Sequence, residues 1–450
     1  MLKTLKNAFK IKSVRDKLLF TFLMLIVVRV GSQLPVPGVN QSFIKDMFAN
    51  QFDGDFSFFN ALTGGSFENM SIFALNITPY ITSSIIMQLL TIAIPKLEEM
   101  QRDGEEGRKK IVSLTRYVTI ALALIQSLAM AVAFRNQGLF TNFSTMSGGH
   151  KTLTIISAVA TLTAGSAFLM WVGERITENG VGNGISIVLV INIISRMPED
   201  LVNLFNRFVF ADDKIHKAPA SAILAAVIII GIIIAMVVMV IILNDAVRKI
   251  PVQYANKVQG RKMVGGQTSN IPLKVNTAGV IPVIFAQSIL QFPVIISSFA
   301  GYNGTGVWSE ILKYMDSRYW CNFTAGQIKY SVGLLVYILL IIFFAYFYTS
   351  ITFNPLLVAD NLKKAGGFIP GIRPGKLTSD YLNKVLNHIV FIGAVGLTVI
   401  AVIPYLFSSI GASISFGGTS LIIIVSVVLE TMKQVESQML VRNYKGFLEK

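Results

Sequence analysis

Residues 219–243 read PASAILAAVIIIGIIIAMVVMVIIL and contain no charged side chain. An α-helix rises about 1.5 Å per residue, so a helix over this stretch is longer than the roughly 30 Å of hydrocarbon in a bilayer. The helix of a soluble protein would show its apolar residues on one face only. The stretch therefore predicts a transmembrane helix.

Nine further apolar runs lie on both sides of this one. They cover residues 18–36, 71–94, 117–134, 152–172, 183–196, 277–299, 329–350, 386–408 and 419–435. The chain of 450 residues is 53% hydrophobic and 14% charged, whereas about a quarter of the residues of a soluble protein are charged. We therefore predict an all-α polytopic membrane protein with ten transmembrane helices. The run 183–196 is the shortest of them.

The distribution of charge predicts the orientation in the membrane. An even number of spans places both termini on one side, and Lys and Arg in short loops mark the cytoplasmic side. The two termini and the loops on their side hold 28 of the 39 Lys and Arg residues, the opposite face holds ten, and Arg29 lies within the first span. Both termini are therefore predicted to be cytoplasmic. The net charge of +15 does not indicate a nucleic-acid-binding protein, because the basic residues lie between hydrophobic runs.

Two loops on the basic face are longer than the two to eight residues, roughly, that a helical hairpin needs. The loop 244–275 contains β-leaning stretches at 249–254 and 269–275, and the loop 354–385 contains a Pro/Gly-rich motif at 370–375. Two interpretations are open. The loops are either a solvated basic surface beside anionic lipid or a docking platform for a cytoplasmic partner.

The sequence carries no recognisable catalytic residue, metal site or cofactor pattern. It has no phosphate-binding glycine loop, and His150, His216 and His388 are far apart in the chain. The single cysteine, Cys321, excludes an internal disulfide. No carboxylate lies at mid-depth of a predicted span, where ion-coupled transporters usually bury one. We therefore expect neither an enzyme nor a proton- or sodium-coupled transporter.

A weak internal echo joins the two halves of the chain. Residues 77–81 read ITPYI in the second span, and residues 280–284 read VIPVI in the seventh. Each has a β-branched residue two positions before a proline and an isoleucine two positions after it. The match is either chance or the trace of two five-helix halves, and inverted repeats place a transport path at their interface.

Residues 56–67 read FSFFNALTGGSF, a stretch that is apolar but too short to span a bilayer. It is either a re-entrant or interfacial segment without a special role, or a short helix folded back into a cavity. The second arrangement requires protein or water around the segment.

A set of motifs in a fixed order resembles one known family. In chain order they are 29–32 with 35–38, 64–88, 107–110, 177–186, 272–276, 354–355, 359–364, 370–375 and 416–420. With these motifs the chain closely resembles the bacterial SecY family, the channel subunits of Sec protein translocons. The external loops 136–150, 197–218 and 300–327 are the least family-like parts, and no function is assigned to them.

The resemblance implies an hourglass pore between two pseudo-symmetric five-helix halves. The halves would be residues 18–210 and 211–435, with a cytoplasmic N-terminus at 1–17 and a cytoplasmic tail at 436–450. A ring of apolar side chains would narrow the pore, and the matching positions are Ile77, Ile81, Leu189, Ile284 and Ile423. Leu189 stands where isoleucine is common in the family. A rim of this kind closes on water and ions and yields to a passing chain.

The resemblance also implies a plug, a lateral gate and a docking surface. The plug would cover about residues 57–68, including Phe58, Phe59, Leu62, Gly64, Gly65 and Phe67. Gln88, Gln126 and Asn276 lie on or beside the spans of the gate, where a hydrogen bond between helices is worth about 1 kcal/mol. The candidate docking residues are Arg261, Lys363, Lys364 and Arg373.

The implied function is a protein-conducting channel in the bacterial cytoplasmic membrane. It would pass unfolded secretory polypeptides across the membrane and release transmembrane segments sideways into lipid. The implied partners are SecE-like and SecG-like small membrane subunits, the SecA motor ATPase, the ribosome, signal peptides and nascent chains, and membrane lipids. The alternative is a solute or lipid transporter with inverted repeats. The missing mid-membrane carboxylates and the two basic loops favour the channel.

Overall fold

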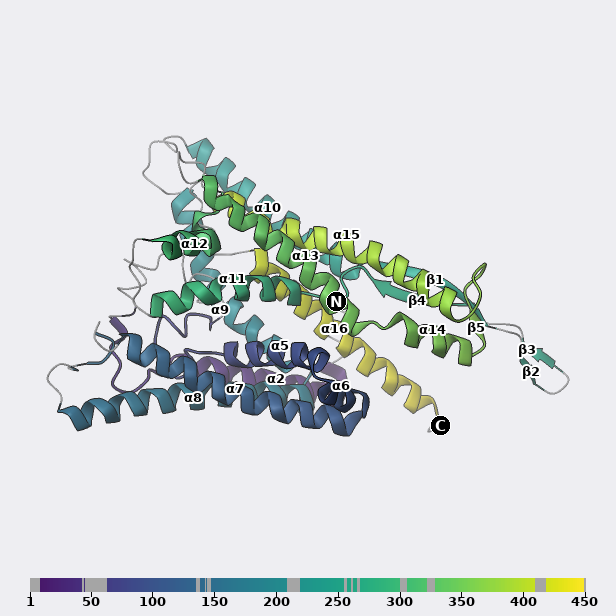
Figure 1. Ribbon diagram of the computed structural model, residues 1–450, viewed down its shortest axis with the longest axis horizontal. Helices are drawn as coiled ribbons and strands as arrows, with labels where there is room; N and C mark the ends of the chain where they lie inside the picture. The colour runs from purple at the N-terminus through teal and green to yellow at the C-terminus, as the bar shows by residue number, and fades with distance from the viewer. Residues whose placement is uncertain are drawn as a thin grey trace.

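Long α-helices that run roughly along one axis make up most of the computed structural model (Figure 1). The structure describes residues 9–42, 44, 63–134, 138–141, 143, 147–208, 219–254, 257–259, 262–264, 268–299, 306–321, 328–408 and 418–448. The helices of the first half are α2 Lys12–Gly31, α5 Thr78–Ala93, α6 Pro95–Arg102, α7 Glu105–Phe134, α8 Gly148–Asn179 and α9 Gly184–Phe208. Those of the second half are α10 Pro219–Asp245, α11 Ile281–Phe299, α12 Val307–Met315, α13 Val332–Thr352, α14 Pro355–Lys364, α15 Lys376–Ser408 and α16 Gly418–Leu448.

Each of the ten predicted spans overlaps one α-helix of the structure. Two of these helices show why their bounds differ from the predicted ones. The second helix, α5, begins only at Thr78, because residues 71–77 form turns. The shortest predicted span is part of α9, a helix of 25 residues that continues past Pro198. The predicted span ends at residue 196 because the sequence becomes polar there, although the helix continues to Phe208.

Length and hydropathy alone identify fewer spans in the described residues than the ten that are predicted. In the described part of the chain five helices are long and apolar enough to cross a membrane, and α5 with α6 makes a sixth if this pair, bent by 106°, counts as one span. Among the other long helices, α2 carries Arg15 and Lys17 and α9 carries Glu199. In α11 the part Ile281–Gln291 is apolar but shorter than a span. The number of ten crossings therefore stays a prediction.

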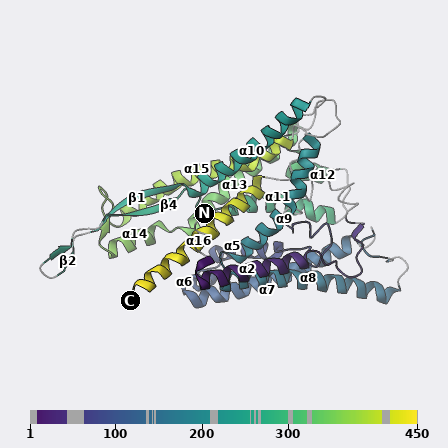
Figure 2. The same ribbon diagram turned by 180° about the vertical axis from the view of Figure 1, so that it is seen from behind.

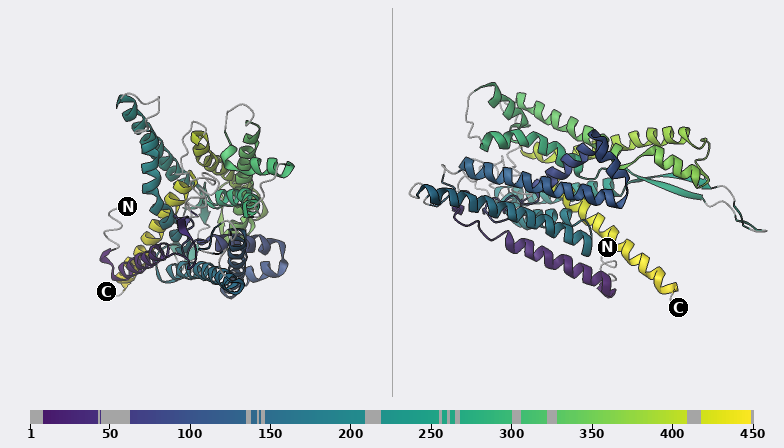
Figure 3. Two further views of the ribbon diagram at one scale, coloured as in Figure 1. Left: turned by 90° about the vertical axis from the view of Figure 1, so that its left-hand side faces the viewer. Right: turned by 60° about the horizontal axis from the view of Figure 1, so that its bottom comes forward.

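The two halves of the chain form two groups of helices that meet along a seam. In the first group α7 packs against α5 and α8, and in the second α13 packs against α11 and α15. Figure 2 shows α9, α11 and α16 between α8 on one side and α10 on the other. Across the seam α9 contacts α16 and α10, and α7 contacts α11. Viewed from the end that carries α12, the blue first-half helices and the green second-half helices lie on opposite sides (Figure 3, left).

The sequence match between residues 77–81 and 280–284 has a structural counterpart. Pro79 is the second residue of α5, and Pro282 is the second residue of α11. Proline is tolerated in the first turn of a helix, where the backbone N–H that it lacks would have no partner. Ile81 and Ile284 then occupy the fourth position of their helices. The equivalent helices of the two halves thus begin in the same way.

The two long basic loops form one folded unit. Strand β1 Val247–Tyr254 pairs antiparallel with β4 Thr268–Lys274, and β5 Gly367–Phe368 pairs with the other edge of β1. Apolar side chains from both loops and from α15 share a core, namely Ile250, Val252, Leu273, Leu362, Ile369, Leu382 and Ile389. We call this unit, residues 247–275 and 355–382, the loop platform. A small hairpin of β2 Lys257–Gln259 and β3 Lys262–Val264 lies at its far tip (Figure 1).

The elements that carry the basic loops lie at one end of the helix bundle. Figure 1 shows α6, α14, the strands and the C-terminal end of α16 at this end, and α12 at the opposite end. The helices therefore alternate in direction as the charge pattern predicts. The structure contains no membrane, so the cytoplasmic assignment of this end stays a prediction.

Thiol labelling tests that assignment. A cysteine that replaces Gly148 is expected to react with a membrane-impermeant reagent from outside the cell, because Gly148 has open space around it at the end of the bundle opposite α6. Cysteines at the exposed positions Glu99 and Asn361 are expected to react only after the membrane is opened. The parent chain, whose single Cys321 is buried, is the unlabelled control. The reverse labelling pattern would contradict the orientation.

Candidate functional site

An apolar cluster lies where the two halves meet. Its buried members are Leu189, Val190 and Ile193 from α9, Ile284 from α11, and Ile423 and Val427 from α16. Ile81 from α5 is partly buried against them. Four of the five predicted ring residues, contributed by four different helices, therefore pack together. We call this set the seam cluster.

The fifth predicted ring residue, Ile77, lies in a neighbouring cluster. It is fully buried among first-half residues such as Phe73, Leu169 and Val188. Ile81 contacts both clusters, so it joins Ile77 to the seam cluster. Ile77 precedes the first residue of α5 and so lies at the N-terminal end of that helix.

Several members of the seam cluster were not predicted from the sequence. They are Ile187, Val190, Ile193, Val280, Ile424 and Val427. Helical spacing was the available signal, because Ile193, Val280 and Val427 each lie four residues from a ring position on their own helix segment. The cluster contains only aliphatic side chains. It can exclude water and ions without binding either of them.

The C-terminal part of the predicted plug lies against α9. Gly64 and Gly65 have φ angles of +63° and +79°, which favour glycine. A Cβ at Gly64 would lie 2.6 Å from the backbone oxygen of Asn192, so only glycine allows this approach. Phe67 is buried in the core of the first half beside Met70. Phe58, Phe59 and Leu62 lie outside the described residues.

The predicted gate residues do not form one cross-gate hydrogen-bond set. Asn276 is buried, and its side chain donates to Asn244 Oδ1 at 2.8 Å, while Asn244 donates to Ser426 Oγ at 2.6 Å. Asn276 thus ties the segment before α11 to α10 and α16. Gln88 on α5 and Gln126 on α7 are half-buried.

The contact between α5 and the second half is apolar. Ile85 on α5 packs against the core formed by α10, α11, α13 and α15. Within the first half, the hydroxyls of Ser83 on α5 and Thr119 on α7 lie 2.5 Å apart. The structure therefore holds α5 to α7 by a polar contact and to the second half by an apolar one.

The candidate docking residues that the structure describes are exposed on the loop platform. Lys363 and Lys364 end α14, and Arg373 lies in the turn before α15. This turn is well fixed, because Thr378 Oγ1 donates to the Arg373 carbonyl oxygen at 2.9 Å and Gly371 and Gly375 have φ angles of +82° and +103°. Arg261 lies outside the described residues.

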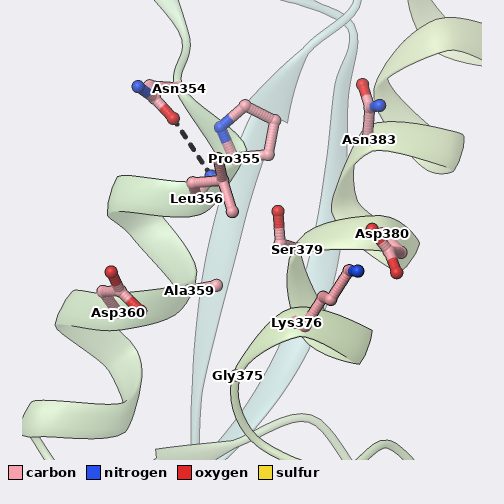
Figure 4. Close-up of a pocket in the computed structure, with 10 residues that line it drawn as sticks. All are labelled: Asn354, Pro355, Leu356, Ala359, Asp360, Gly375, Lys376, Ser379, Asp380 and Asn383. Carbon is pink, nitrogen blue, oxygen red and sulfur yellow. Dashed lines mark hydrogen bonds between the residues drawn. The ribbon is translucent and has the colours of Figure 1, made fainter.

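A pocket of about 550 Å³ lies beside this turn, between α14 and the start of α15 (Figure 4). Asn354 caps α14 by accepting a hydrogen bond from the Leu356 N–H at 3.1 Å. Asp360 and Asp380 stand on opposite walls, and Lys376 lies between them. The described residues contain no group of three His, Cys, Asp or Glu side chains that could hold a metal ion.

A comparison with known proteins assigns this architecture. A family model for SecY matches residues 71–432, which is most of the chain. The chain belongs to the SecY family. The protein translocase subunit SecY of Halalkalibacterium halodurans is 44% identical over 457 residues, and the match covers 100% of both chains.

Solved structures share the fold at lower sequence identity. One is a SecY protein whose plug domain stabilises the closed state of the translocation channel and maintains a membrane seal. It has a TM-score of 0.60 and 19% identity, and the match covers 94% of this chain and 92% of that one. Another is Sec61 in the canine ribosome–channel complex from the endoplasmic reticulum, with a TM-score of 0.55, 18% identity and the same coverage.

Membership of the SecY family confirms the predicted fold class and the predicted class of function. The chain is a helical multi-pass membrane protein, and it is a protein-conducting channel subunit and not an enzyme. The transporter alternative is not favoured.

Proposed function

We propose that this SecY chain passes unfolded secretory polypeptides through the seam cluster and releases transmembrane segments sideways between α5 and α7 on one side and α11 and α13 on the other. The observation that carries this proposal is the position of the seam cluster. Its side chains come from both halves, on α5, α9, α11 and α16, so a relative movement of the halves opens it.

The chemistry of the seam suits a transient opening for many different polypeptides. Aliphatic contacts such as those of Ile81, Ile284 and Ile423 have no directional bonds to break and no preference for one client sequence. The apolar packing of Ile85 on the second half has the same character at the proposed lateral gate. A leaving transmembrane segment would replace one apolar surface with another.

The energy for transport would come from partners, which would dock on the loop platform. The platform is a folded unit with exposed basic side chains, and a bilayer-spanning hairpin does not require it. We propose that the SecA motor ATPase and the ribosome contact it, since the canine Sec61 relative is found in a ribosome complex. SecE-like and SecG-like subunits would cover the lipid-facing helices. The membrane would be the bacterial cytoplasmic membrane, with both termini in the cytoplasm.

Reconstituted transport tests this function. Vesicles that contain the purified chain with a SecE-like and a SecG-like subunit are expected to take up a secretory precursor when SecA and ATP are added. Uptake should depend on the signal sequence, because the channel must be opened by its client. A precursor without its signal sequence is the control. Equal uptake of both precursors, or none of either, would argue against the proposal.

A further inference from the structure

Two polar contacts connect the segment before α5 to α9, at Asn192 and Arg196. Arg196 Nη1 lies 2.7 Å from Glu68 Oε2, in an ion pair whose side chains are 21% and 30% exposed. The Asn192 side-chain amide donates to Asn76 Oδ1 at 3.1 Å, and both residues are buried. The partners are 128 and 116 residues apart in the chain. Neither contact is a by-product of local helix geometry.

The backbone of the same segment is shaped for this position. Asn76 has a φ angle of +52°, which non-glycine residues seldom adopt, and its carbonyl oxygen accepts a hydrogen bond from Ser166 Oγ at 2.9 Å. Gly64 lies directly on the backbone of Asn192. The segment from Gly64 to Asn76 therefore contacts α9 at both of its ends and near its middle.

On α9, the residues that make these contacts lie on the same helix face as the residues of the seam cluster. Leu189, Asn192, Ile193 and Arg196 are spaced by three, four and seven residues from Leu189, so they share one helix face. The face changes from aliphatic at Leu189 to charged at Arg196. Residues 64–68 thus lie one to two helical turns beyond the ring position that α9 supplies.

We propose that Glu68–Arg196 and Asn76–Asn192 form a latch that holds the plug side of the channel on α9 in the closed state. Opening of the channel would require the latch to break before the plug moves away from the seam cluster. The latch residues are positioning residues, which set how strongly a signal sequence must act. The inference rests on the proposed channel function, in which the segment around Gly64 and Phe67 belongs to the plug.

The strength of the latch fits a switch that must open. An ion pair with this partial exposure shifts an equilibrium by a few-fold only. The Asn192 Oδ1 atom is buried without a hydrogen-bond partner, so the amide pair is not saturated either. A client can therefore release the latch.

Charge exchange tests the ion pair. The variants Glu68→Arg and Arg196→Glu each place like charges together, and the double variant restores an opposite pair in reversed order. Ion leak from vesicles without precursor, and the uptake of a precursor with a weakened signal sequence relative to the intact one, would be measured. Each single variant is expected to raise both quantities about fivefold, and the double variant to return them to within about twofold of the parent.

A separate variant tests the hydrogen bond between Asn192 and Asn76. Asn76→Gly keeps a backbone that suits the positive φ angle and removes only the side-chain amide. It is expected to raise the leak by a smaller factor of about two to three, since one neutral hydrogen bond is lost. The matched control is the exchange of Arg175 and Glu178, an exposed ion pair at 2.8 Å near the C-terminal end of α8. This exchange should change neither the ion leak nor the uptake of the precursor with a weakened signal sequence.

The outcomes separate the latch from the proposed function. Leak at the parent level in both single variants would overturn the latch, and so would a double variant that leaks as much as the singles. If a reversed charge prevents insertion, Glu68→Gln and Arg196→Gln replace the single variants with the same expected direction. Failure of the parent chain to take up the intact precursor would instead contradict the channel function.

Discussion

Arg373→Glu is expected to lower motor-driven translocation by more than about tenfold while the protein remains folded and inserted. Reversing a close charge contact at an interface costs several kcal/mol, on the order of 2 to 5, which exceeds the 1.4 kcal/mol or so that corresponds to tenfold. A guanidinium in a fixed turn can make charge-assisted, bidentate contacts with acidic groups of a partner. The measurement is SecA- and ATP-dependent uptake of a secretory precursor into vesicles.

The structure explains why this substitution should leave the fold intact. Arg373 is exposed, and the contact that fixes its turn is made by its backbone carbonyl oxygen with Thr378, which any side chain at 373 allows. Lysine at this position should restore transport only in part, because a single ammonium cannot reproduce the planar fork.

A second charge reversal on the same platform separates docking from general electrostatics. Lys249 is exposed on β1, so Lys249→Glu changes the net charge of the platform equally. It is expected to reduce uptake far less than Arg373→Glu. Equal losses would mean that the platform acts only as a basic surface, and parent-level uptake by Arg373→Glu would remove this residue from the docking site.

Ile81→Asn combined with Ile284→Asn is expected to raise ion leak through the closed channel about tenfold or more. The closed state would have to bury two amides, and a buried amide without partners costs about 1–3 kcal/mol. Water that enters the seam cluster would relieve this cost and wet the constriction. Ion flux from vesicles is the direct measurement, and acceptance of precursors with weakened signal sequences should rise with it.

A matched pair on the same two helices controls for the chemical change. Ile92 on α5 and Ile289 on α11 are exposed on the surface of the bundle and lie outside the seam cluster. The double variant Ile92→Asn with Ile289→Asn should leave the leak near the parent level. Unchanged leak in a correctly inserted Ile81 and Ile284 double variant would make these residues ordinary packing positions.

Local sequence patterns were sufficient for the features that depend on neighbouring residues. Apolar runs such as 219–243 located the helices, because each helix in a bilayer satisfies its own backbone hydrogen bonds and needs only an apolar surface. The stretches 249–254 and 269–275 were predicted to lean towards β-structure, and they form β1 and β4. The two prolines that the sequence match shares, Pro79 and Pro282, both lie in the first turn of a helix.

Motif matches placed the candidate site only in part. They identified Ile81, Leu189, Ile284 and Ile423, which the structure brings into one cluster, but they put Ile77 in the same ring although it packs in the neighbouring first-half core. They also predicted Asn276 as a gate residue, whereas its hydrogen bond connects it to Asn244 on α10. The roles of these residues in transport stay predictions.

The sequence by itself determined where the helices lie, which loops share the basic end of the bundle, and the family. Only the tertiary structure decided which distant segments meet. It joined Gln253 of one loop to Phe368 of the other in a single sheet, completed the seam cluster with Ile193 and Val427, and paired Glu68 with Arg196. The physical reason is that hydropathy and turn patterns record how a residue interacts with its chain neighbours and its solvent, whereas each of these contacts depends on how separate helices and strands are packed in space.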